Sequence, residues 1–380
     1  MMQIDEDVLD DQDRLTEADT GEMLRVVAGA GAQIREASTL TLEAGVDKLA
    51  NEAPSRSCVL TGIGSSATPV GLVRAVVGVD SPLPLVTHPG GRLPRWVGPL
   101  DTVFAVSRSG TAVETLEAVE DAGRRGCGLV VVARPESPLE ELARRFRGLF
   151  VPADRTPRHT RASLWHLSVP LLMAADRLGV TSVPGEIIAT TADILDRVAE
   201  ACRPTCESFV NPAKELALAL AGDLPVVWGS GEVGAFAAER FVRQLSSNAK
   251  YPGVQARLRE VAHGGIALLD GPFARRPETE LFRDRVDDAD GSEQPRIRLV
   301  LLRDDAEPED DRQRRAAAGV LADARGVPVH EVAAEGLHPL ERLASLVGHT
   351  DFASVYLALC LGVDPTPTRA VLELKDRVRQ

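Results

Sequence analysis

Residues 102–110 read Thr-Val-Phe-Ala-Val-Ser-Arg-Ser-Gly, and this stretch predicts a strand that gives way abruptly to a helix. The apolar, β-branched run up to Val106 is typical of a buried strand, and residues 107–110 mark its end. From Val113 to Gly123, apolar residues recur at helical spacing with charged residues between them. The junction therefore gathers backbone N–H groups, the hydroxyls of Ser107 and Ser109 beside Gly110, and the positive end of a helix dipole. Together these groups suit a phosphate.

A second junction of the same kind lies upstream, where residues 58–67 read Cys-Val-Leu-Thr-Gly-Ile-Gly-Ser-Ser-Ala. It adds Gly64, Ser65 and Ser66 as candidate phosphate ligands. Two such turns at the carboxyl ends of strands in one domain predict a single phosphate-bearing ligand between them. Gly-x-Gly is also how a dinucleotide-binding fingerprint begins, but Ala67 stands where the third glycine is expected and no acidic strand end follows. We therefore expect no cofactor.

Apolar runs alternate with helical patterns along most of the chain, which is typical of parallel sheets with crossover helices. In the first half the expected strands are Cys58–Thr61, Leu85–Thr87, Thr102–Ser107, Leu129–Ala133 and Leu149–Pro152. The same order of a Gly/Ser turn, helix and strands begins again near residue 224. We expect an N-terminal helical segment (1–35), two similar α/β domains (36–185 and 186–345) and a C-terminal helical tail (346–380). Two domains also suit a chain of 380 residues.

Composition and charge exclude several classes of partner. The net charge of −13 argues against a nucleic-acid or anionic membrane surface, and no basic helix-turn-helix segment is present. We find no uninterrupted apolar run of membrane-spanning length, and the acidic residues 1–22 do not resemble a signal peptide. The five cysteines lack the paired spacing of a zinc site, so we expect no metal and a reducing cytoplasm.

Six segments carry, in order, a resemblance to a known family. They are residues 62–67, residues 107–110 with Glu114-Thr115, residues 161–164 (Arg-Ala-Ser-Leu), residues 248–250 (Asn-Ala-Lys), residues 258–263 (Leu-Arg-Glu-Val-Ala-His), and residues 362–367 with Leu374-Lys375. In this order they resemble the sugar isomerase (SIS) fold, and specifically the bifunctional phosphoglucose/phosphomannose isomerase family. The resemblance covers nearly the whole chain.

The resemblance implies a fold, a reaction and an assembly. The fold is α/β with two SIS-type domains, each a flavodoxin- or Rossmann-like parallel sheet flanked by helices, plus C-terminal helices. The reaction is aldose–ketose isomerisation of hexose 6-phosphates through an enediol. His263 and Lys375 correspond to the groups that assist ring opening, and Arg161 to the arginine that stabilises the enediolate. The family works as a homodimer in which the histidine reaches the neighbouring subunit's site.

This sequence departs from the family at the catalytic base. The glutamate expected before Asn248 is replaced by Ser247, whose hydroxyl has too high a pKa to abstract a carbon-bound proton near neutrality. Ala112 replaces a phosphate-binding threonine, and Gly264-Gly265 replaces an Asn-Glu pair. Two hypotheses follow: an active isomerase with a relocated base, Glu260 or Glu239, or a sugar-phosphate sensor or partner protein that has lost catalysis. We predict that fructose 6-phosphate binds but converts slowly or not at all.

Overall fold

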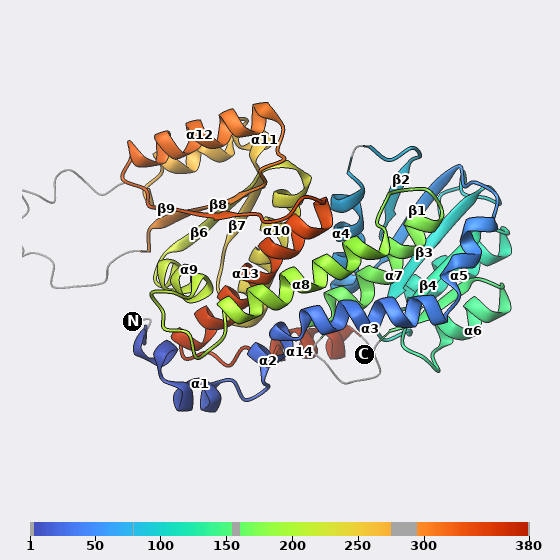
Figure 1. Ribbon diagram of the computed structural model, residues 1–380, viewed down its shortest axis with the longest axis horizontal. Helices are drawn as coiled ribbons and strands as arrows, with labels where there is room; N and C mark the ends of the chain where they lie inside the picture. The colour runs from blue at the N-terminus through green and yellow to red at the C-terminus, as the bar shows by residue number, and fades with distance from the viewer. Residues whose placement is uncertain (1–3, 79, 154–159, 275–294, 379–380) are drawn as a thin grey trace, which may run out of the picture. The chain divides into compact units, whose positions relative to one another are not determined.

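The chain forms two compact units, each built around one parallel sheet (Figure 1). The computed structural model describes residues 4–78, 80–153, 160–274 and 295–378. The first-sheet unit comprises Gly29–Asp196 with His338–Glu341, and the second-sheet unit comprises Met1–Ala28, Arg197–Leu337 and Arg342–Gln380. Of the expected N-terminal segment 1–35, residues up to Ala28 are grouped with the second sheet and those from Gly29 with the first, and the expected C-terminal tail is grouped with the second sheet.

The strands are short and mostly buried. In the first-sheet unit they are β1 (Ser57–Gly62), β2 (Leu85–His88), β3 (Asp101–Ser107), β4 (Gly128–Ala133) and β5 (Leu149–Pro152). In the second-sheet unit they are β6 (Leu224–Gly229), β7 (Val254–Arg257), β8 (Ile297–Arg303) and β9 (Val329–Ala333).

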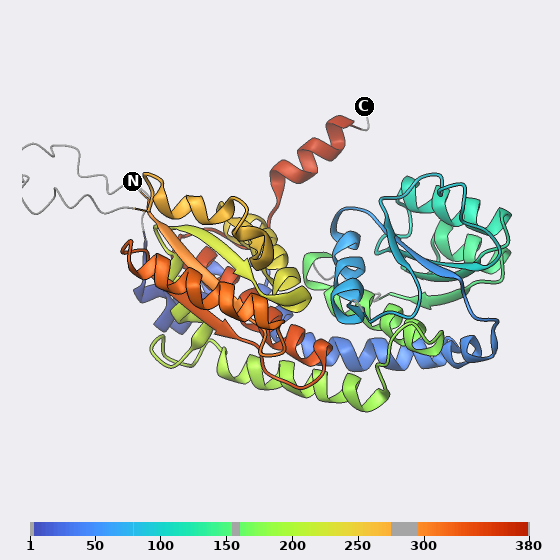
Figure 2. The ribbon, with the colours of Figure 1, turned by 90° about the horizontal axis from the view of Figure 1, so that it is seen from above.

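Helices connect and cover these strands, and Figure 2 shows them from a second direction. In the first-sheet unit they are α3 (Ala30–Glu43), α4 (Ala67–Val77), α5 (Val113–Arg124), α6 (Pro138–Arg145) and α7 (Leu164–Arg177), followed by α8 (Gly185–Ala201), which crosses the boundary between the units. The second-sheet unit has α1 (Gln12–Ala18), α2 (Met23–Ala28), α9 (Pro212–Leu220), α10 (Gly231–Gln244), α11 (Leu258–Val261), α12 (Glu309–Asp323), most of α13 (Pro339–Cys360) and α14 (Arg369–Val378).

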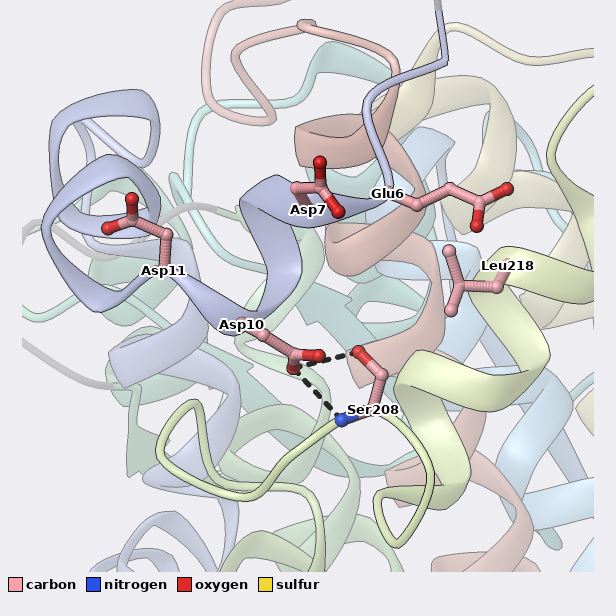
Figure 3. A pocket seen from close by; sticks show the side chains of 6 residues that line it. All are labelled: Glu6, Asp7, Asp10, Asp11, Ser208 and Leu218. Carbon is pink, nitrogen blue, oxygen red and sulfur yellow. Dashed lines mark hydrogen bonds between the residues drawn. The ribbon is translucent and has the colours of Figure 1, made fainter.

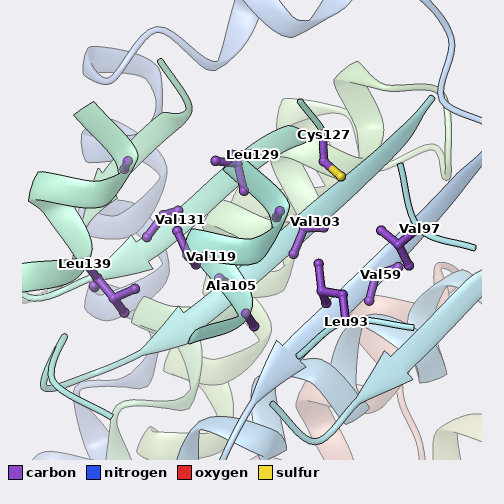
Figure 4. Packing of buried hydrophobic residues seen from close by; sticks show 14 residues of the cluster. Val59, Leu93, Val97, Val103, Ala105, Val119, Cys127, Leu129, Val131 and Leu139 are labelled. Carbon is purple, nitrogen blue, oxygen red and sulfur yellow. The ribbon is translucent and has the colours of Figure 1, made fainter. Parts of the chain in front are cut away.

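The first sheet has the strand order β2-β1-β3-β4-β5, with every pair parallel. Alternate residues of β1, β3 and β4, such as Val59, Val103 and Val131, pack against α5 and α6 in one buried cluster (Figure 4). Because successive side chains of a strand point to opposite faces, burial of every residue of β1 and β3 shows that both faces are covered. The expected parallel α/β sheet is confirmed.

The second sheet repeats this order as β7-β6-β8-β9, again all parallel. Trp228, Leu299 and Leu301 anchor its core against α11 and α12. Strand β7 was not expected from the sequence, because it is four residues long, lies at the sheet edge and carries polar residues on both sides of Ala256. The two-domain fold class, with C-terminal helices α13 and α14, is confirmed.

The expected N-terminal helical segment is broken into short pieces, two of which begin at side-chain caps. The Asp11 carboxylate accepts hydrogen bonds from the backbone N–H groups of Asp13 and Arg14, which starts α1. The Asp19 carboxylate accepts bonds from Met23 and Leu24 at 2.8 Å, which starts α2. Aspartate at these positions satisfies N–H groups that a continuous helix would bond internally, so each one restarts the helix.

Helix α13 is the one described helix with the length and composition of a membrane span. However, 94% of its most apolar window is buried inside the protein. Charged residues also interrupt it, and Asp351 forms a buried ion pair with Arg240 of α10. Its hydropathy is that of a core helix.

Candidate functional site

The two sequence-predicted phosphate turns lie side by side in the first-sheet unit. β1 pairs with β3 in parallel register, Gly62 opposite Val106, so both strands end at the same edge of the sheet. β2 pairs with the other side of β1 and β4 with the other side of β3, which makes the gap between β1 and β3 the topological switch point. In open α/β sheets, ligands bind at that point, beyond the carboxyl ends of the strands.

A hydrogen bond joins the two turns. The backbone N–H of Arg108, directly after β3, donates to Ser66 Oγ of the first turn at 3.3 Å. Ser66 and Ser107 are buried, whereas Ser65 and Ser109 are exposed. The buried serines thus belong to the frame of the site, and the exposed pair presents hydroxyls to solvent.

Glycines give the turns their shape. Gly64 has φ +61° and Gly110 has φ +70°, a region that favours glycine. A Cβ on Gly110 would lie 2.2 Å from Ser137 Oγ, because Ser137, at the start of α6, packs directly against the turn. Leu139 N–H also donates to the Gly110 carbonyl at 3.3 Å. The packing of Ser137 against Gly110 therefore fixes the conformation of the second turn.

Two helix N-termini start at this edge of the sheet. The residues before α4 and α5, Ser66 and Ala112, make no side-chain capping bond to another described residue. The first N–H groups of a helix have no partner within it, and together with the helix dipole they favour an anion. The site can therefore hold a phosphate by backbone groups and hydroxyls alone.

Thr111 is a candidate ligand that the sequence reasoning did not single out. Its hydroxyl donates to Ser109 Oγ at 3.0 Å, and its side chain is exposed. The family resemblance places a threonine at position 112, where this chain has alanine. The neighbouring Thr111 supplies a hydroxyl one residue earlier. Its place in the sequence, between Gly110 and Ala112, could have identified it as a candidate phosphate ligand.

Arg161 lies in the same unit, half-buried in the short 3-10 turn η4 (Thr160–Ala162) before α7. The structure thus places the predicted enediolate-stabilising arginine in the unit that carries both phosphate turns. The other predicted catalytic residues, Ser247, His263 and Lys375, all belong to the second-sheet unit.

Ser247 is half-buried in a π-helical turn, η5 (Leu245–Ala249), that extends α10. Such turns widen a helix by one residue and are frequent at functional sites. The turn ends at Lys250, which has the left-handed φ of +54°. The next residue after Ser247, Asn248, is fully buried and donates from Nδ2 to Ser354 Oγ of α13 at 2.8 Å.

A ladder of polar side chains supports this turn. Arg240 donates from Nε and Nη2 to the Asp351 carboxylate at 3.0 and 2.6 Å, and Gln244 bonds the same carboxylate. Burial raises the pKa of Asp351, and Arg240 and Gln244 oppose this shift. Arg240, Gln244 and Asn248 recur every four residues, so they share one helix face toward α13. This spacing was readable in the sequence, but the partners on α13 were not.

The C-terminal tail forms a hydrogen bond to the end of the π turn that contains Ser247. Lys250 Nζ donates to the carbonyl of Asp364 at 2.8 Å, and the Asp364 carboxylate accepts from Thr20 Oγ1 at 2.7 Å. Helix α14, which carries Lys375, begins five residues later at Arg369. The structure therefore places the segment that precedes α14 next to the turn that contains Ser247. The Lys375 side chain itself lies outside the described part of the structure.

The remaining site candidates lie on exposed positions. His263 follows α11, and its N–H donates to the carbonyl of Glu260. His263 and Glu260 are both exposed. Glu239 forms an ion pair with Arg243, one turn along α10, at 2.8 Å, and lies about 12 Å along the helix axis from Ser247. Glu239 is thus paired with Arg243 and lies more than two helical turns from Ser247.

A pocket of about 350 Å³ lies elsewhere in the second-sheet unit (Figure 3). It is lined by Glu6, Asp7, Asp10, Asp11, Ser208 and Leu218. The Asp10 carboxylate accepts from the N–H and hydroxyl of Ser208 at 2.9 and 2.8 Å. An acidic lining repels a phosphate, so this pocket is not the predicted site. The described part of the chain also holds no His, Cys, Asp and Glu group able to bind a metal.

Solved structures share this fold at low sequence identity. A hypothetical protein from Thermus thermophilus superposes with a TM-score of 0.67 at 16% identity, covering 96% of this chain and 94% of that one. Tagatose-6-phosphate ketose/aldose isomerase from Escherichia coli gives 0.64 at 15% identity, covering 92% and 96%. The fold is that of the SIS phosphosugar isomerases.

Sequence comparison finds narrower similarities. Residues 209–378 match the family described as bacterial phospho-glucose isomerase C-terminal SIS domain. Bifunctional phosphoglucose/phosphomannose isomerase from Caldicellulosiruptor bescii is 28% identical over 324 residues, 85% of this chain and 89% of that protein. The enzyme of the same name from Aquifex aeolicus is 27% identical over 289 residues, 76% and 79%. Residues 209–378 thus resemble a bacterial phospho-glucose isomerase C-terminal SIS domain, and most of the chain is similar to bifunctional phosphoglucose/phosphomannose isomerases.

Proposed function

We propose that the protein binds a hexose 6-phosphate at the switch point between β1 and β3 and has the framework of an aldose–ketose isomerase. The observation that carries the proposal is the hydrogen bond from Arg108 N–H to Ser66 Oγ, which holds two Gly/Ser turns at one sheet edge. The names of the curated relatives, bifunctional phosphoglucose/phosphomannose isomerases, support hexose phosphates as the substrate class.

Each predicted residue has a role in this proposal. The phosphate is held by N–H groups and hydroxyls of the two turns, at positions Gly64, Ser65, Ser66, Ser107, Ser109 and Gly110. Arg161 stabilises negative charge on the enediolate, and His263 and Lys375 assist ring opening, as the family resemblance implies. The family assembly makes the functional form a homodimer. The five free cysteines fit a reducing cytoplasm.

Proton transfer between C1 and C2 is the step for which this chain has no glutamate at the position that the family resemblance implies. A positioned general base contributes about 10²–10⁴-fold to such a reaction, and Ser247 does not supply one. Glu239 is disfavoured as a replacement, because it lies on α10 eight residues before Ser247 and its carboxylate pairs with Arg243. This specific loss favours the second candidate function, a sugar-phosphate sensor or partner protein built on the isomerase framework.

Two measurements separate the candidates. Binding of fructose 6-phosphate is measured by calorimetry, and conversion to glucose 6-phosphate by a coupled dehydrogenase assay. We expect binding without appreciable turnover in the natural sequence. Turnover at the rate of an ordinary isomerase would mean that another group acts as base, and absence of binding would remove the proposal altogether.

Restoring the base tests the one-residue explanation. Ser247→Glu is expected to raise turnover by about 10²–10⁴-fold, since the glutamate returns to the family position. Ser246→Glu is the matched control, because Ser246 lies in the same π turn but its side chain is exposed. If Ser247→Glu binds fructose 6-phosphate and stays inactive, the loss of catalysis has a further cause.

A further inference from the structure

The second sheet has a switch point built like the first. β6 and β8 pair with Gly229 opposite Leu302, as Gly62 of β1 pairs opposite Val106 of β3. The turn after β6 contains Ser230 and then Gly231, whose φ of +60° matches that of Gly64.

A comparable hydrogen bond joins the turns in both sheets, although the accepting serine comes directly after β6 in the second sheet and four residues after β1 in the first. In the second sheet, Asp304 N–H after β8 donates to Ser230 Oγ at 2.9 Å. In the first sheet, Arg108 N–H after β3 donates to Ser66 Oγ at 3.3 Å. The chain therefore contains two copies of one frame that, in the first sheet, suits a phosphate.

In the second sheet, three carboxylate side chains lie at the switch point between β6 and β8. The side chains of Asp304, Glu307 and Asp311 converge there and are almost fully buried, at 3, 5 and 2% exposure. Each is paired with an arginine at short distance: Asp304 with Arg342 (2.6 Å), Glu307 with Arg315 (2.8 Å) and Asp311 with Arg314 (3.1 Å). In the first sheet the corresponding positions, counted from the paired strand ends and the helix starts, carry Arg108, Thr111 and Thr115, none of which is acidic.

One of these carboxylates lies where an anionic ligand would bind, in front of a helix N-terminus. Asp311 Oδ2 accepts from the backbone N–H of Gly231, the first residue of α10, at 3.1 Å. Asp311 itself is in the first turn of α12. Its charge is therefore bound at the N-termini of the two helices that follow β6 and β8, where dipoles and unpaired N–H groups favour an anion.

We infer that Asp311 is a built-in substitute for phosphate, and that the protein consequently binds a single sugar phosphate per chain, at the first sheet. Asp311 takes up the N–H of Gly231 that an anionic ligand needs, and its carboxylate occupies the space in front of that N–H. The single-site part rests on the proposed function, whereas the blocking role of Asp311 stands on the second sheet alone.

The experiment counts bound inorganic phosphate per chain in the wild type and in Asp311→Ser, by calorimetry and ³¹P NMR titration. Asp310→Ser is the matched control, because Asp310 precedes Asp311 in the same helical turn but is 78% exposed. We expect Asp311→Ser to bind one more phosphate than the wild type, and Asp310→Ser to bind the same number as the wild type.

Several outcomes decide the matter. An unchanged count in an Asp311→Ser protein with native circular dichroism overturns the blocking role. A wild type that binds two fructose 6-phosphate molecules per chain also overturns the inference, and this measurement needs no variant to fold. If the first site fails to bind, every count falls by one, but the difference between Asp311→Ser and wild type remains, so the two failures are distinguishable.

Discussion

The close packing of Gly110 against Ser137 gives a sharp prediction for Gly110→Ala. A Cβ at this position would lie 2.2 Å from Ser137 Oγ and 2.3 Å from Ser137 Cβ. A hydroxyl can rotate away, but Ser137 Cβ is fixed to the backbone and the residue is 4% exposed. The backbone of the phosphate turn must therefore move.

The expected cost has two parts. Alanine at φ +70° costs about 1–2 kcal/mol because its Cβ approaches the following carbonyl. Overpacking against Ser137 adds about 1–3 kcal/mol. Gly126→Ala separates the two, since Gly126 has φ +73° in the same unit but its nearest neighbour, Pro99 Cγ, is 4.0 Å away. Gly126→Ala should therefore be destabilised only by the cost of alanine at a positive φ.

Urea unfolding measures these stabilities, and calorimetry measures fructose 6-phosphate binding. We expect Gly110→Ala to weaken binding by at least about tenfold, which corresponds to about 1.4 kcal/mol, and Gly126→Ala to leave it unchanged. Adding Ser137→Gly to Gly110→Ala should recover the overpacking part, because it removes both contacting atoms. Ser137 makes no side-chain capping bond to a described residue, so this second change costs only a few tenths of a kcal/mol. Equal destabilisation by Gly110→Ala and Gly126→Ala would refute the reasoning.

Three further predictions concern stability and reactivity. Burial raises the pKa of Asp101, but hydrogen bonds led by Arg56 outweigh it and leave that pKa lowered. The ionised pair therefore stabilises the fold above the unfolded-state pKa of Asp101 and is lost as pH falls through the lower folded-state value, so Asp101→Asn should flatten the acid side of a Tm–pH curve. Lys214 is fully buried and donates from Nζ to several backbone carbonyls, so Lys214→Met, which leaves these acceptors without a donor, should cost at least about 1–3 kcal/mol in urea unfolding. Burial raises the pKa of Cys58 to about 12, so an aromatic disulfide reagent should label the half-buried Cys206 first and Cys58 only on unfolding; labelling in the opposite order would contradict this packing.

The local pattern of the chain was enough to predict most strands and both phosphate turns. Buried parallel strands are continuous apolar runs, and Gly/Ser turns mark their ends, so β1 and β3 stand out in the sequence. Strand β7 does not, because a four-residue polar edge strand gains its identity from pairing with β6 rather than from its own residues. The breaks at Asp11 and Asp19 were also hidden, since an aspartate in a helical pattern is compatible with both a cap and a solvated face.

The sequence by itself determined which residue types are available: two sets of hydroxyls and glycines after strands, and a serine where the family has its glutamate. Only the tertiary structure decided how those groups are used. It joined the turns through Arg108 N–H and Ser66 Oγ and tied Lys250 to the carbonyl of Asp364, 114 residues away. It also placed Asp311, far along the chain, on the N–H of Gly231. Such contacts depend on strand register and helix packing, which bring together residues whose sequence separation carries no signal of their proximity.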